Sequence, residues 1–224
     1  GYKAYRRWAQ ALFELTWPLR LMGGRTGTGK TDLLLAMERR GIAILDLEGM
    51  ANHRGSSFGG LGLPAQPTTE HYENKLAEAL DRQRLNQAPE IWVEAESIQV
   101  GCCRIPKGLF DQMKTAPVLE ICRSLDERVQ QLVGVYGHQG AVALAEATRR
   151  ISRRLGPQRT QEALDAIARG DWATACRATL DYYDHCYDRE MARTSRRQSV
   201  DLSGTTAAGA VERLICHGLI GVDH

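Results

Sequence analysis

Eight consecutive residues have the types and the spacing of a phosphate-binding loop. Gly24-Arg25-Thr26-Gly27-Thr28-Gly29-Lys30-Thr31 fits the pattern G-x-x-x-x-G-K-[ST]. Glycines allow the backbone to wrap closely around an anion, with several N–H groups pointing inward. The Lys30 ammonium can then reach an outer phosphate, and the Thr31 hydroxyl can ligate Mg²⁺. The loop therefore predicts a ligand that carries phosphate groups.

The segments on both sides of this loop are those that such a site needs. Residues 19–22 are a short apolar run that predicts a buried strand, and residues 31–40 predict a helix that ends at Gly41. A strand, a glycine-rich loop and a helix in this order direct the positive end of the helix dipole at the anion. A chance glycine turn is the alternative, and the order of the elements disfavours it.

Acidic residues stand near the ends of two further expected strands. The strand predicted over residues 42–47 carries Asp46, and the strand predicted over residues 91–97 carries Glu94 and Glu96. Ligands of open α/β sheets bind at this end of the strands. Because a buried acid needs a cation or a donor, Asp46 or Glu94 is a candidate to hold Mg²⁺ together with the loop threonine. A structural ion pair with the loop lysine or an arginine is an equal alternative for the two glutamates.

Residues 52–67 are rich in glycine and proline and predict neither helix nor strand. A loop of this length inside a compact domain is either functional or disordered. His53, Arg54, Ser56 and Ser57 are not typical of a linker. We therefore expect a lid whose polar and cationic groups face a charged substrate, with disorder as the alternative.

The order of the expected elements predicts an α/β fold, a P-loop NTPase-like parallel sheet flanked by helices. Strands and helices alternate as far as residue 123, which is typical of βαβ units with right-handed crossovers. From Ser124 onward the pattern predicts helices only. We expect an N-terminal linker helix within residues 1–18, a P-loop α/β domain over 19–123 and a helical C-terminal subdomain over 124–224.

Composition narrows the class of protein further. The chain has 224 residues, of which 43% are hydrophobic and 25% charged, as in ordinary soluble globular proteins. No apolar run is long enough to span a bilayer and no signal peptide opens the sequence, so we expect a cytoplasmic protein without a membrane partner. The six cysteines form no C-x-x-C pair and no zinc pattern. Only the adjacent Cys102 and Cys103 are candidates for a functional thiol, with a structural role as the alternative.

Arginines form two clusters in the second half of the chain. The first has Arg149, Arg150, Arg153 and Arg154 at helical spacing, and the second has Arg193, Arg196 and Arg197. The first cluster is either a solvated helix face with Glu146 paired to Arg150 or a surface that contacts RNA phosphates. The net charge of +2 does not decide between these alternatives.

Several of these segments together resemble the tRNA 2-selenouridine synthase family. They are Gly27–Thr31, Leu45–Glu48, His53–Gly59, Trp92–Ser97 and Ile105–Pro106. The H-R-G-S-S-F-G segment makes the resemblance specific, since a P-loop alone would not distinguish this family. The opening residues 1–6 resemble the family's segment that follows its rhodanese domain. The resemblance therefore implies the P-loop part of such a protein, with a separate rhodanese domain as a partner.

The resemblance implies a transferase that acts on 2-thiouridine at the wobble position of tRNA. Family members are described as transferring a geranyl group from geranyl diphosphate to the sulfur and then replacing S-geranyl by selenium from selenophosphate. Both co-substrates carry phosphate, in agreement with the P-loop. A P-loop nucleotide kinase or NTPase and a non-catalytic tRNA-binding module are the alternatives that the residues leave open.

The resemblance also assigns expected roles to the residues discussed above. The residues expected to bind phosphate are Gly24, Arg25, Gly27, Thr28, Gly29, Lys30, Thr31, Ser56 and Ser57. Catalysis falls to Lys30, His53, Arg54, Asp46 and Glu94, with His53 and Arg54 stabilising the leaving diphosphate. Mg²⁺ falls to Thr31 and Asp46, and the two arginine clusters are expected to contact the tRNA.

Overall fold

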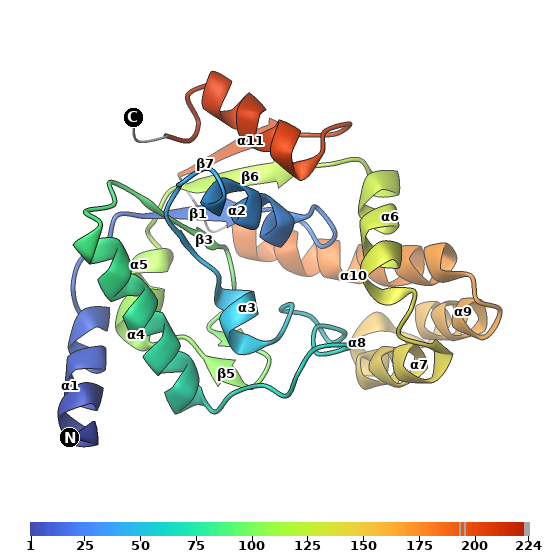
Figure 1. Ribbon diagram of the computed structural model, residues 1–224. Coiled ribbons are helices and arrows are strands. Elements are labelled where there is room, and N and C mark those ends of the chain that lie inside the picture. Colours follow the sequence, from blue (N-terminus) through green and yellow to red (C-terminus); the bar gives the residue numbers. More distant parts are fainter. Residues whose placement is uncertain (193, 195, 222–224) are drawn as a thin grey trace.

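A five-stranded parallel sheet forms the centre of the protein in its computed structural model, which describes residues 1–192, 194 and 196–221 (Figure 1). The strands are β1 (Leu19–Gly23), β2 (Ile44–Leu45), β3 (Ile91–Glu94), β6 (Val118–Cys122) and β7 (Arg197–Asp201). They lie in the order β2-β3-β1-β6-β7, and all pairings are parallel. The sheet and its flanking helices confirm the expected α/β, P-loop NTPase-like class.

Helices cover both faces of this sheet. One face carries α1 (Tyr2–Phe13), α4 (Thr69–Leu85) and α5 (Lys107–Met113), and the other carries α2 (Lys30–Glu38) and α11 (Ala207–Cys216). Strand side chains alternate between the faces, so Leu21 and Val93 pack with the first group, whereas Met22 and Trp92 pack with the second. The P-loop strand β1 lies between β3 and β6, in the middle of the sheet.

A group of helices lies beside the sheet, next to the P-loop (Figure 1). Its members are α6 (Leu125–Tyr136), α7 (Ala141–Arg150), α8 (Ser152–Leu155), α9 (Pro157–Ala168) and α10 (Trp172–Met191). Helix α6 begins with a capping box, in which Ser124 and Glu127 satisfy each other's backbone N–H groups. Helices α7, α9 and α10 share a small apolar cluster. Residues 125–191 thus form the helices expected there, and their standing as a separate subdomain stays a prediction.

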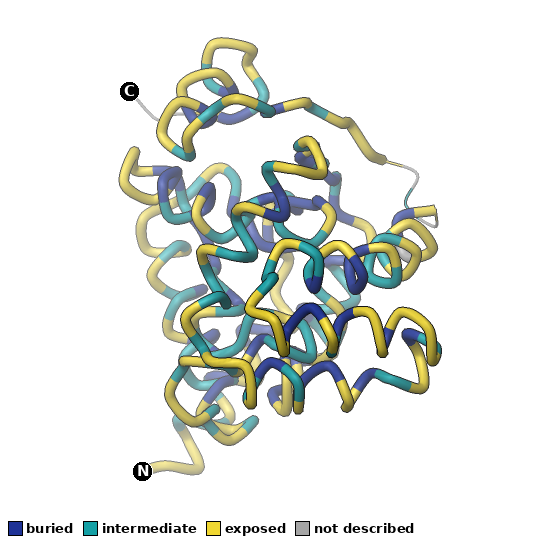
Figure 2. Tube along the Cα trace, turned by 90° about the vertical axis from the view of Figure 1, so that its right-hand side faces the viewer, coloured by how far each residue is buried: buried dark blue, intermediate teal, exposed yellow. Residues whose placement is uncertain are grey.

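The expectation of helices only after Ser124 is wrong at residues 197–201, which form β7. Arg-Gln-Ser-Val-Asp has no apolar run, and all but one of its residues are exposed, as the outer trace in Figure 2 shows. An edge strand needs little apolar surface, so its pattern does not reveal it. Helix α11 then packs against α2 and the sheet. The division of the chain at residue 123 stays a prediction, but residues 197–216 lie on the sheet.

Other differences concern the ends of elements. The strand expected over residues 42–47 ends early because Asp46 accepts a hydrogen bond from Gly49 N, at 2.7 Å, and starts the short helix α3 (Leu47–Ala51). The chain after β3 makes a small hairpin of β4 (Gln99–Val100) and β5 (Cys103–Arg104), which the sequence did not indicate. No described helix is long and apolar enough to cross a membrane.

The packing of α4 gives a test of the fold. Leu76 is fully buried against the sheet, whereas Leu85, at the end of the same helix, is 69% exposed. Leu76→Ala should lower the free energy of unfolding by about 2–5 kcal/mol because it leaves a cavity. Leu85→Ala is the matched control and should change it by less than about 0.5 kcal/mol. Urea denaturation measures both, and equal effects would contradict this packing.

Candidate functional site

The P-loop, residues 24–31, connects β1 to the first turn of α2. Gly27 and Gly29 have φ angles of +85° and +77°, which residues with a Cβ rarely adopt. A Cβ at Gly27 would also lie 2.7 Å from the Arg128 carbonyl oxygen. The first N–H groups of α2 have no partners within the helix, so they are free to bind an anion. The local structure therefore has the backbone geometry of an anion cradle, as the sequence predicted, and anion binding by it stays a prediction.

Lys30 and Thr31, the first two residues of α2, both direct polar groups toward this cradle. Lys30 Nζ donates to Gly24 O at 2.8 Å, so the ammonium crosses the loop. The Thr31 hydroxyl donates to Glu48 Oε2 at 2.9 Å. Glu48 belongs to α3, which follows β2. The carboxylate beside Thr31 is thus that of Glu48, to which the sequence analysis assigned no role, while Asp46 caps α3 nearby.

Glu94 lies at the end of β3 and is completely buried. Its Oε2 accepts a hydrogen bond from the Leu47 amide at 3.1 Å, and its Oε1 has no hydrogen-bond partner among the described residues. Burial, followed by the charges of Asp46 and Glu48, raises the pKa of Glu94 well above its usual value, which favours the neutral acid. Glu94 holds the start of α3 in place and does not line the cavity described below. Its catalytic role stays a prediction.

Glu96 and Glu48 lie together against Gly55 in the loop of residues 52–67, which we call the lid loop. A Cβ at Gly55 would come within 2.9 Å of Glu96 Oε2 and 3.0 Å of Glu48 Oε1. Burial raises the pKa of Glu48, while the Lys30 charge and the Thr31 hydroxyl lower it. Among the described residues, no group of three or more His, Cys, Asp or Glu side chains could hold a metal ion. Mg²⁺ bound to a phosphate ligand needs only one or two protein ligands, and Thr31 with Glu48 fits that need.

The loop of residues 52–67 folds over the cradle and is ordered by its own turns. Arg54 Nη1 donates to Leu61 O at 3.0 Å, and its guanidinium lies 5.7 Å from the centre of the Tyr136 ring. Arg54 therefore reaches the cavity wall with its charge held over an aromatic face. His53 packs against Gly59 and does not line the cavity. Burial and the Arg54 charge lower the pKa of His53, which favours a neutral imidazole.

The two serines of this loop have different surroundings. Ser56 lines the cavity, and its Oγ accepts a hydrogen bond from Phe58 N at 3.2 Å. Ser57 points to the helices, because its Oγ donates to Ala147 O at 3.3 Å. Arg54 and Ser56 thus line the cavity beside the P-loop, whereas His53 and Ser57 do not line it. Their expected roles stay predictions.

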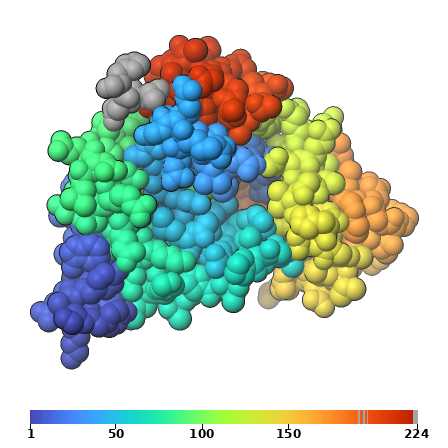
Figure 3. Space-filling view, viewed as in Figure 1, coloured from blue at the N-terminus to red at the C-terminus, as the bar shows by residue number. Residues whose placement is uncertain are grey.

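A large cavity lies between the P-loop, the lid loop, α6 and α10. Its volume is about 480 Å³, and Figure 3 shows the recess between the lid loop and α6. The sequence-predicted residues that line it are Gly24, Gly27, Gly29, Lys30, Thr31, Asp46, Arg54 and Ser56, together with Glu96, one of the two strand glutamates. Its wall also contains Glu48, Tyr136, Tyr183, Cys186 and Tyr187, which had no predicted role. We call it the anion cavity.

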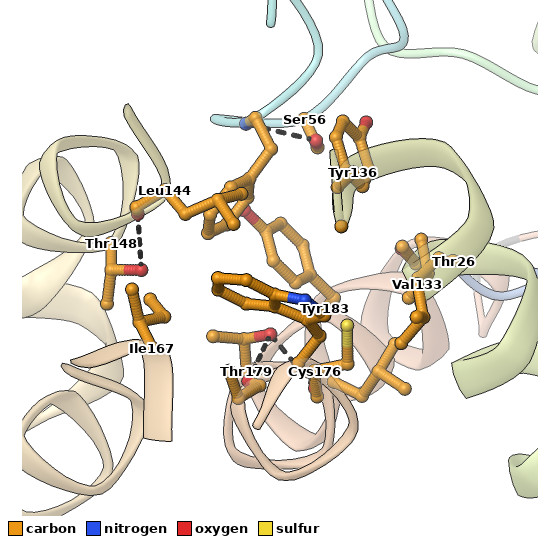
Figure 4. A pocket seen from close by; sticks show the side chains of 16 residues that line it. Thr26, Ser56, Val133, Tyr136, Leu144, Thr148, Ile167, Cys176, Thr179 and Tyr183 are labelled. Carbon is orange, nitrogen blue, oxygen red and sulfur yellow. Dashed lines mark hydrogen bonds between the residues drawn. The ribbon is translucent and has the colours of Figure 1, made fainter. Parts of the chain in front are cut away.

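A second, apolar cavity of about 60 Å³ adjoins the first within the helices α6, α7, α9 and α10 (Figure 4). Its wall is made mainly of Phe58, Leu132, Val133, Leu144, Ile167, Trp172, Ala175 and Leu180. Both cavities share Thr26, Ser56, Leu132, Tyr136 and Tyr183 in their walls. A polar cradle and an apolar chamber therefore meet at the P-loop.

Two arginines tie the P-loop to the surrounding helices. Arg128 of α6 is 3% exposed, donates from Nε to Thr26 O at 2.8 Å, and forms a two-pronged ion pair with Asp184 of α10. Arg25, predicted to bind phosphate, instead pairs with Asp188 of α10, at 2.8 Å, and is not among the residues that line the anion cavity. A role for Arg128 could not be predicted from the sequence, since it is one arginine within an ordinary helical pattern.

The two arginine clusters lie apart. Arg149, Arg150, Arg153 and Arg154 are all exposed on α7 and α8. Arg150 Nη2 donates to Ser57 O at 3.1 Å, and the ion pairs of the described residues do not include one between Arg150 and Glu146. Arg196 and Arg197 are exposed at β7, where Arg197 lies 3.6 Å from Glu120, and Arg193 lies outside the described residues.

The adjacent cysteines favour the structural reading. Cys103 is fully buried in β5 and its thiol donates to Pro67 O at 3.4 Å. Burial raises the pKa of Cys103 to about 11, so its thiolate is disfavoured. Cys102 is exposed, and its amide binds Gln66, which anchors the end of the lid loop. The pair lies in the hairpin β4–β5 and not in the anion cavity.

Comparison with known proteins identifies related sequences. Residues 17–212 match the family model of the tRNA 2-selenouridine synthase AAA domain. The tRNA 2-selenouridine synthase of Hydrogenovibrio crunogenus is 34% identical, over 91% of this chain and 63% of the relative. That of Pseudomonas fluorescens is 34% identical, over 93% and 64%. That of Alcanivorax borkumensis is 37% identical, over 86% and 61%. The chain thus spans about three fifths of the length of these curated relatives.

The buried Glu94 carboxyl gives a pH-dependent prediction. A raised pKa means that the folded state holds the proton more tightly than the unfolded chain does. Glu94 therefore adds stability below its usual pKa of 4.5, and this contribution is lost as the pH rises toward the folded-state value. Glu94→Gln keeps an acceptor for Leu47 N but does not titrate. Its free energy of unfolding should fall less steeply with rising pH, by up to about 1.4 kcal/mol per pH unit.

Urea unfolding of both proteins across a pH series measures this difference. Glu90→Gln is a control, since Glu90 lies just before the same strand but forms a partly exposed ion pair with Arg20. Parallel stability curves for the wild type and Glu94→Gln would show that Glu94 does not hold a proton in the folded state.

Proposed function

Since the chain belongs to the tRNA 2-selenouridine synthase family, we propose that it transfers a geranyl group from geranyl diphosphate to the sulfur of 2-thiouridine in tRNA. We further propose that it supports the later exchange of sulfur for selenium with selenophosphate. The chain spans only part of the relatives' length, so a rhodanese domain is proposed as a partner in the complete reaction.

The junction of the two cavities carries this proposal. An allylic diphosphate has a doubly charged end and an apolar chain, and it reacts at the carbon between them. The anion cavity supplies backbone amides and Lys30 for the charged end, and the apolar cavity supplies an apolar wall against which the chain can pack. The reacting carbon then lies near the shared wall, beside Thr26, Ser56 and Tyr136. A nucleoside phosphate has no long apolar chain for which this chamber would be needed.

The proposed transfer forms a carbon–sulfur bond and breaks a carbon–oxygen bond. The thiocarbonyl sulfur of 2-thiouridine attacks C1 of the geranyl group, and diphosphate leaves with the bonding electron pair. Loss of the N3 proton of the base to water gives a neutral S-geranyl product. Because sulfur is already nucleophilic, the protein mainly needs to stabilise the charge that develops on the leaving group.

The residues around the cradle suit that task. The Lys30 ammonium, which donates a hydrogen bond to Gly24 O, can turn toward the diphosphate without leaving the loop. Arg54 reaches the same cavity from the lid loop. Thr31 with Glu48, and Asp46 nearby, would hold Mg²⁺ that shares its other ligands with the diphosphate. Such an ion would neutralise the leaving charge. The arginine stripe on α7 and α8 is the proposed contact for tRNA phosphates.

One observation supports nucleotide binding as a second candidate function. A polar cavity of about 410 Å³ lies on the other side of the P-loop, between α6 and the start of α11. Its wall includes Gly27, Gly29, Arg123, Gln131 and Thr205, which offer hydrogen-bond donors and acceptors for a nucleoside. A kinase or NTPase would place its nucleoside there and its phosphates in the same cradle. ATP and GTP titrations distinguish this candidate from prenyl transfer.

Removal of the cradle ammonium tests the proposed reaction. Lys30→Ala should lower geranyl transfer by at least about 100-fold, because one preorganised charge contact to a developing anion contributes roughly 3 kcal/mol or more. Lys114→Ala, an exposed lysine at the end of α5, should have no effect. Mass spectrometry of 2-thiouridine tRNA after incubation with geranyl diphosphate gives the readout. Full activity of Lys30→Ala would refute the assignment.

Filling the apolar cavity tests the place of the prenyl chain. Ala175 lines this cavity on α10, whereas Ala173 on the same helix is exposed. Ala175→Phe should raise the KM for geranyl diphosphate by about 10-fold or more, because the chain would lose several buried methylene groups. Inorganic diphosphate should inhibit wild type and variant equally, since the cradle is unchanged. Ala173→Phe is the matched control, and equal behaviour of the two phenylalanine variants would contradict the proposed chain site.

A further inference from the structure

Tyr182 lies on α10, next in sequence to Tyr183 of the cavity wall, and α8 packs against the same helix. The Tyr182 hydroxyl lies near the Arg154 guanidinium of α8 and the Cys186 thiol of α10. Cys186, one turn further along α10, is exposed and lines the anion cavity. A continuous row of side chains therefore leads from the arginine stripe on the surface to the inside of the cavity.

The same stripe also contacts the lid loop. Arg150, one turn before Arg154, donates to Ser57 O at 3.1 Å. The neighbouring Ser56 lines both cavities. Two of the four arginines thus lie next to residues of the cavity wall, Arg150 against the lid loop and Arg154 near Tyr182 of α10, while Arg149 and Arg153 are exposed beside them.

Tyr182 is half-buried, and its ring forms an edge-to-face pair with Tyr183, with the ring centres 5.2 Å apart. Tyr183 belongs to the shared wall of the two cavities. Tyr182 is therefore fixed on one side by a neighbouring aromatic ring, and it continues that aromatic wall outward to the surface. A tyrosine held in this way loses little conformational freedom when a flat ligand stacks on it.

The charge near Tyr182 favours an anionic partner. Helix α10 carries the acids Asp181, Asp184 and Asp188 on successive turns. Each of them is paired with an arginine, namely Arg159, Arg128 and Arg25 in that order. These three acids are thus compensated, whereas the exposed stripe on α7 and α8 adds positive charge beside the anion cavity. An anionic chain would meet attraction and not repulsion there.

We propose that the surface formed by Arg150, Arg154 and Tyr182, beside the wall of the anion cavity, is the docking site for an unpaired nucleotide of an RNA loop. The base stacks on the Tyr182 ring, and the adjoining phosphates bind the arginines. Flat bases next to phosphates are the ligand for which an aromatic ring flanked by guanidinium groups is suited. The inference rests on the proposed RNA substrate and adds how that substrate reaches the cavity. It requires single-stranded RNA, since paired bases cannot stack on a protein side chain.

Binding of a fluorescein-labelled RNA hairpin with one 2-thiouridine in its loop tests this site by fluorescence anisotropy. Tyr182→Phe keeps the ring and should bind within about 3-fold of the wild type. Tyr182→Leu keeps apolar bulk without a ring and should weaken binding by about 5- to 100-fold, the effect of losing one base stack. Arg154→Gln should reduce the slope of log Kd against log salt by about one. Tyr2→Ala and Arg7→Ala, on α1, are controls and should bind like the wild type.

Equal binding by Tyr182→Phe and Tyr182→Leu would overturn the proposal, as would equal wild-type affinity for a fully paired RNA of the same length. Circular dichroism of each variant identifies a loss of binding that is caused by unfolding. Geranyl transfer to free 2-thiouridine is measured separately. Transfer without dependence of RNA binding on Tyr182 would refute this site alone, and Tyr182-dependent binding without transfer would refute the proposed reaction alone.

Discussion

The buried pair of Arg128 and Asp184 holds together the parts from which the site is built. Arg128 lies on α6, Asp184 lies on α10, and the same guanidinium donates to Thr26 O in the P-loop. A guanidinium that is 3% exposed needs all of these partners, because an unpaired charge at such a position would cost several kcal/mol. The cradle and the helices that enclose the apolar cavity are therefore fixed relative to one another.

This constraint explains why a polar and an apolar cavity can adjoin. Thr26, whose carbonyl oxygen is held by Arg128, forms part of both walls. The lid loop completes the junction, since Ser56 also belongs to both walls and Phe58 packs against Tyr136. A donor with a charged end and an apolar chain would span both chambers. This arrangement is the structural basis of the proposed prenyl transfer.

The carboxyl groups near the cradle differ in burial and in the groups that they contact. Glu94 is completely buried and holds the Leu47 amide at the start of α3. Helix α3 in turn presents Glu48 to the Thr31 hydroxyl. Glu94, which the strand pattern had singled out, thus positions Glu48, which accepts the hydrogen bond from Thr31 beside the cradle. Glu94 is held within a strand of the sheet, whereas Glu48 lies on a short helix beyond the end of a strand, where its side chain reaches the P-loop.

The sequence by itself determined the P-loop, the parallel α/β class and most of the helices, because these depend on local spacing. Gly27, Lys30 and Thr31 belong to one continuous segment, and α4 begins at Thr69, directly after its N-cap Thr68. It also singled out the lid loop, of which Arg54 and Ser56 do line the cavity. It missed β7, since an exposed edge strand needs no apolar pattern.

Only the tertiary structure decided which distant side chains complete the site. Arg128 and Asp184 are separated by 56 residues, and no local pattern links them. The apolar cavity arises from four helices whose inward faces look like ordinary core. Glu48, rather than Asp46, meets Thr31 because α3 begins directly after β2 and turns the chain. Contacts between segments far apart in sequence depend on packing, and packing leaves little trace in the residue types of any single segment.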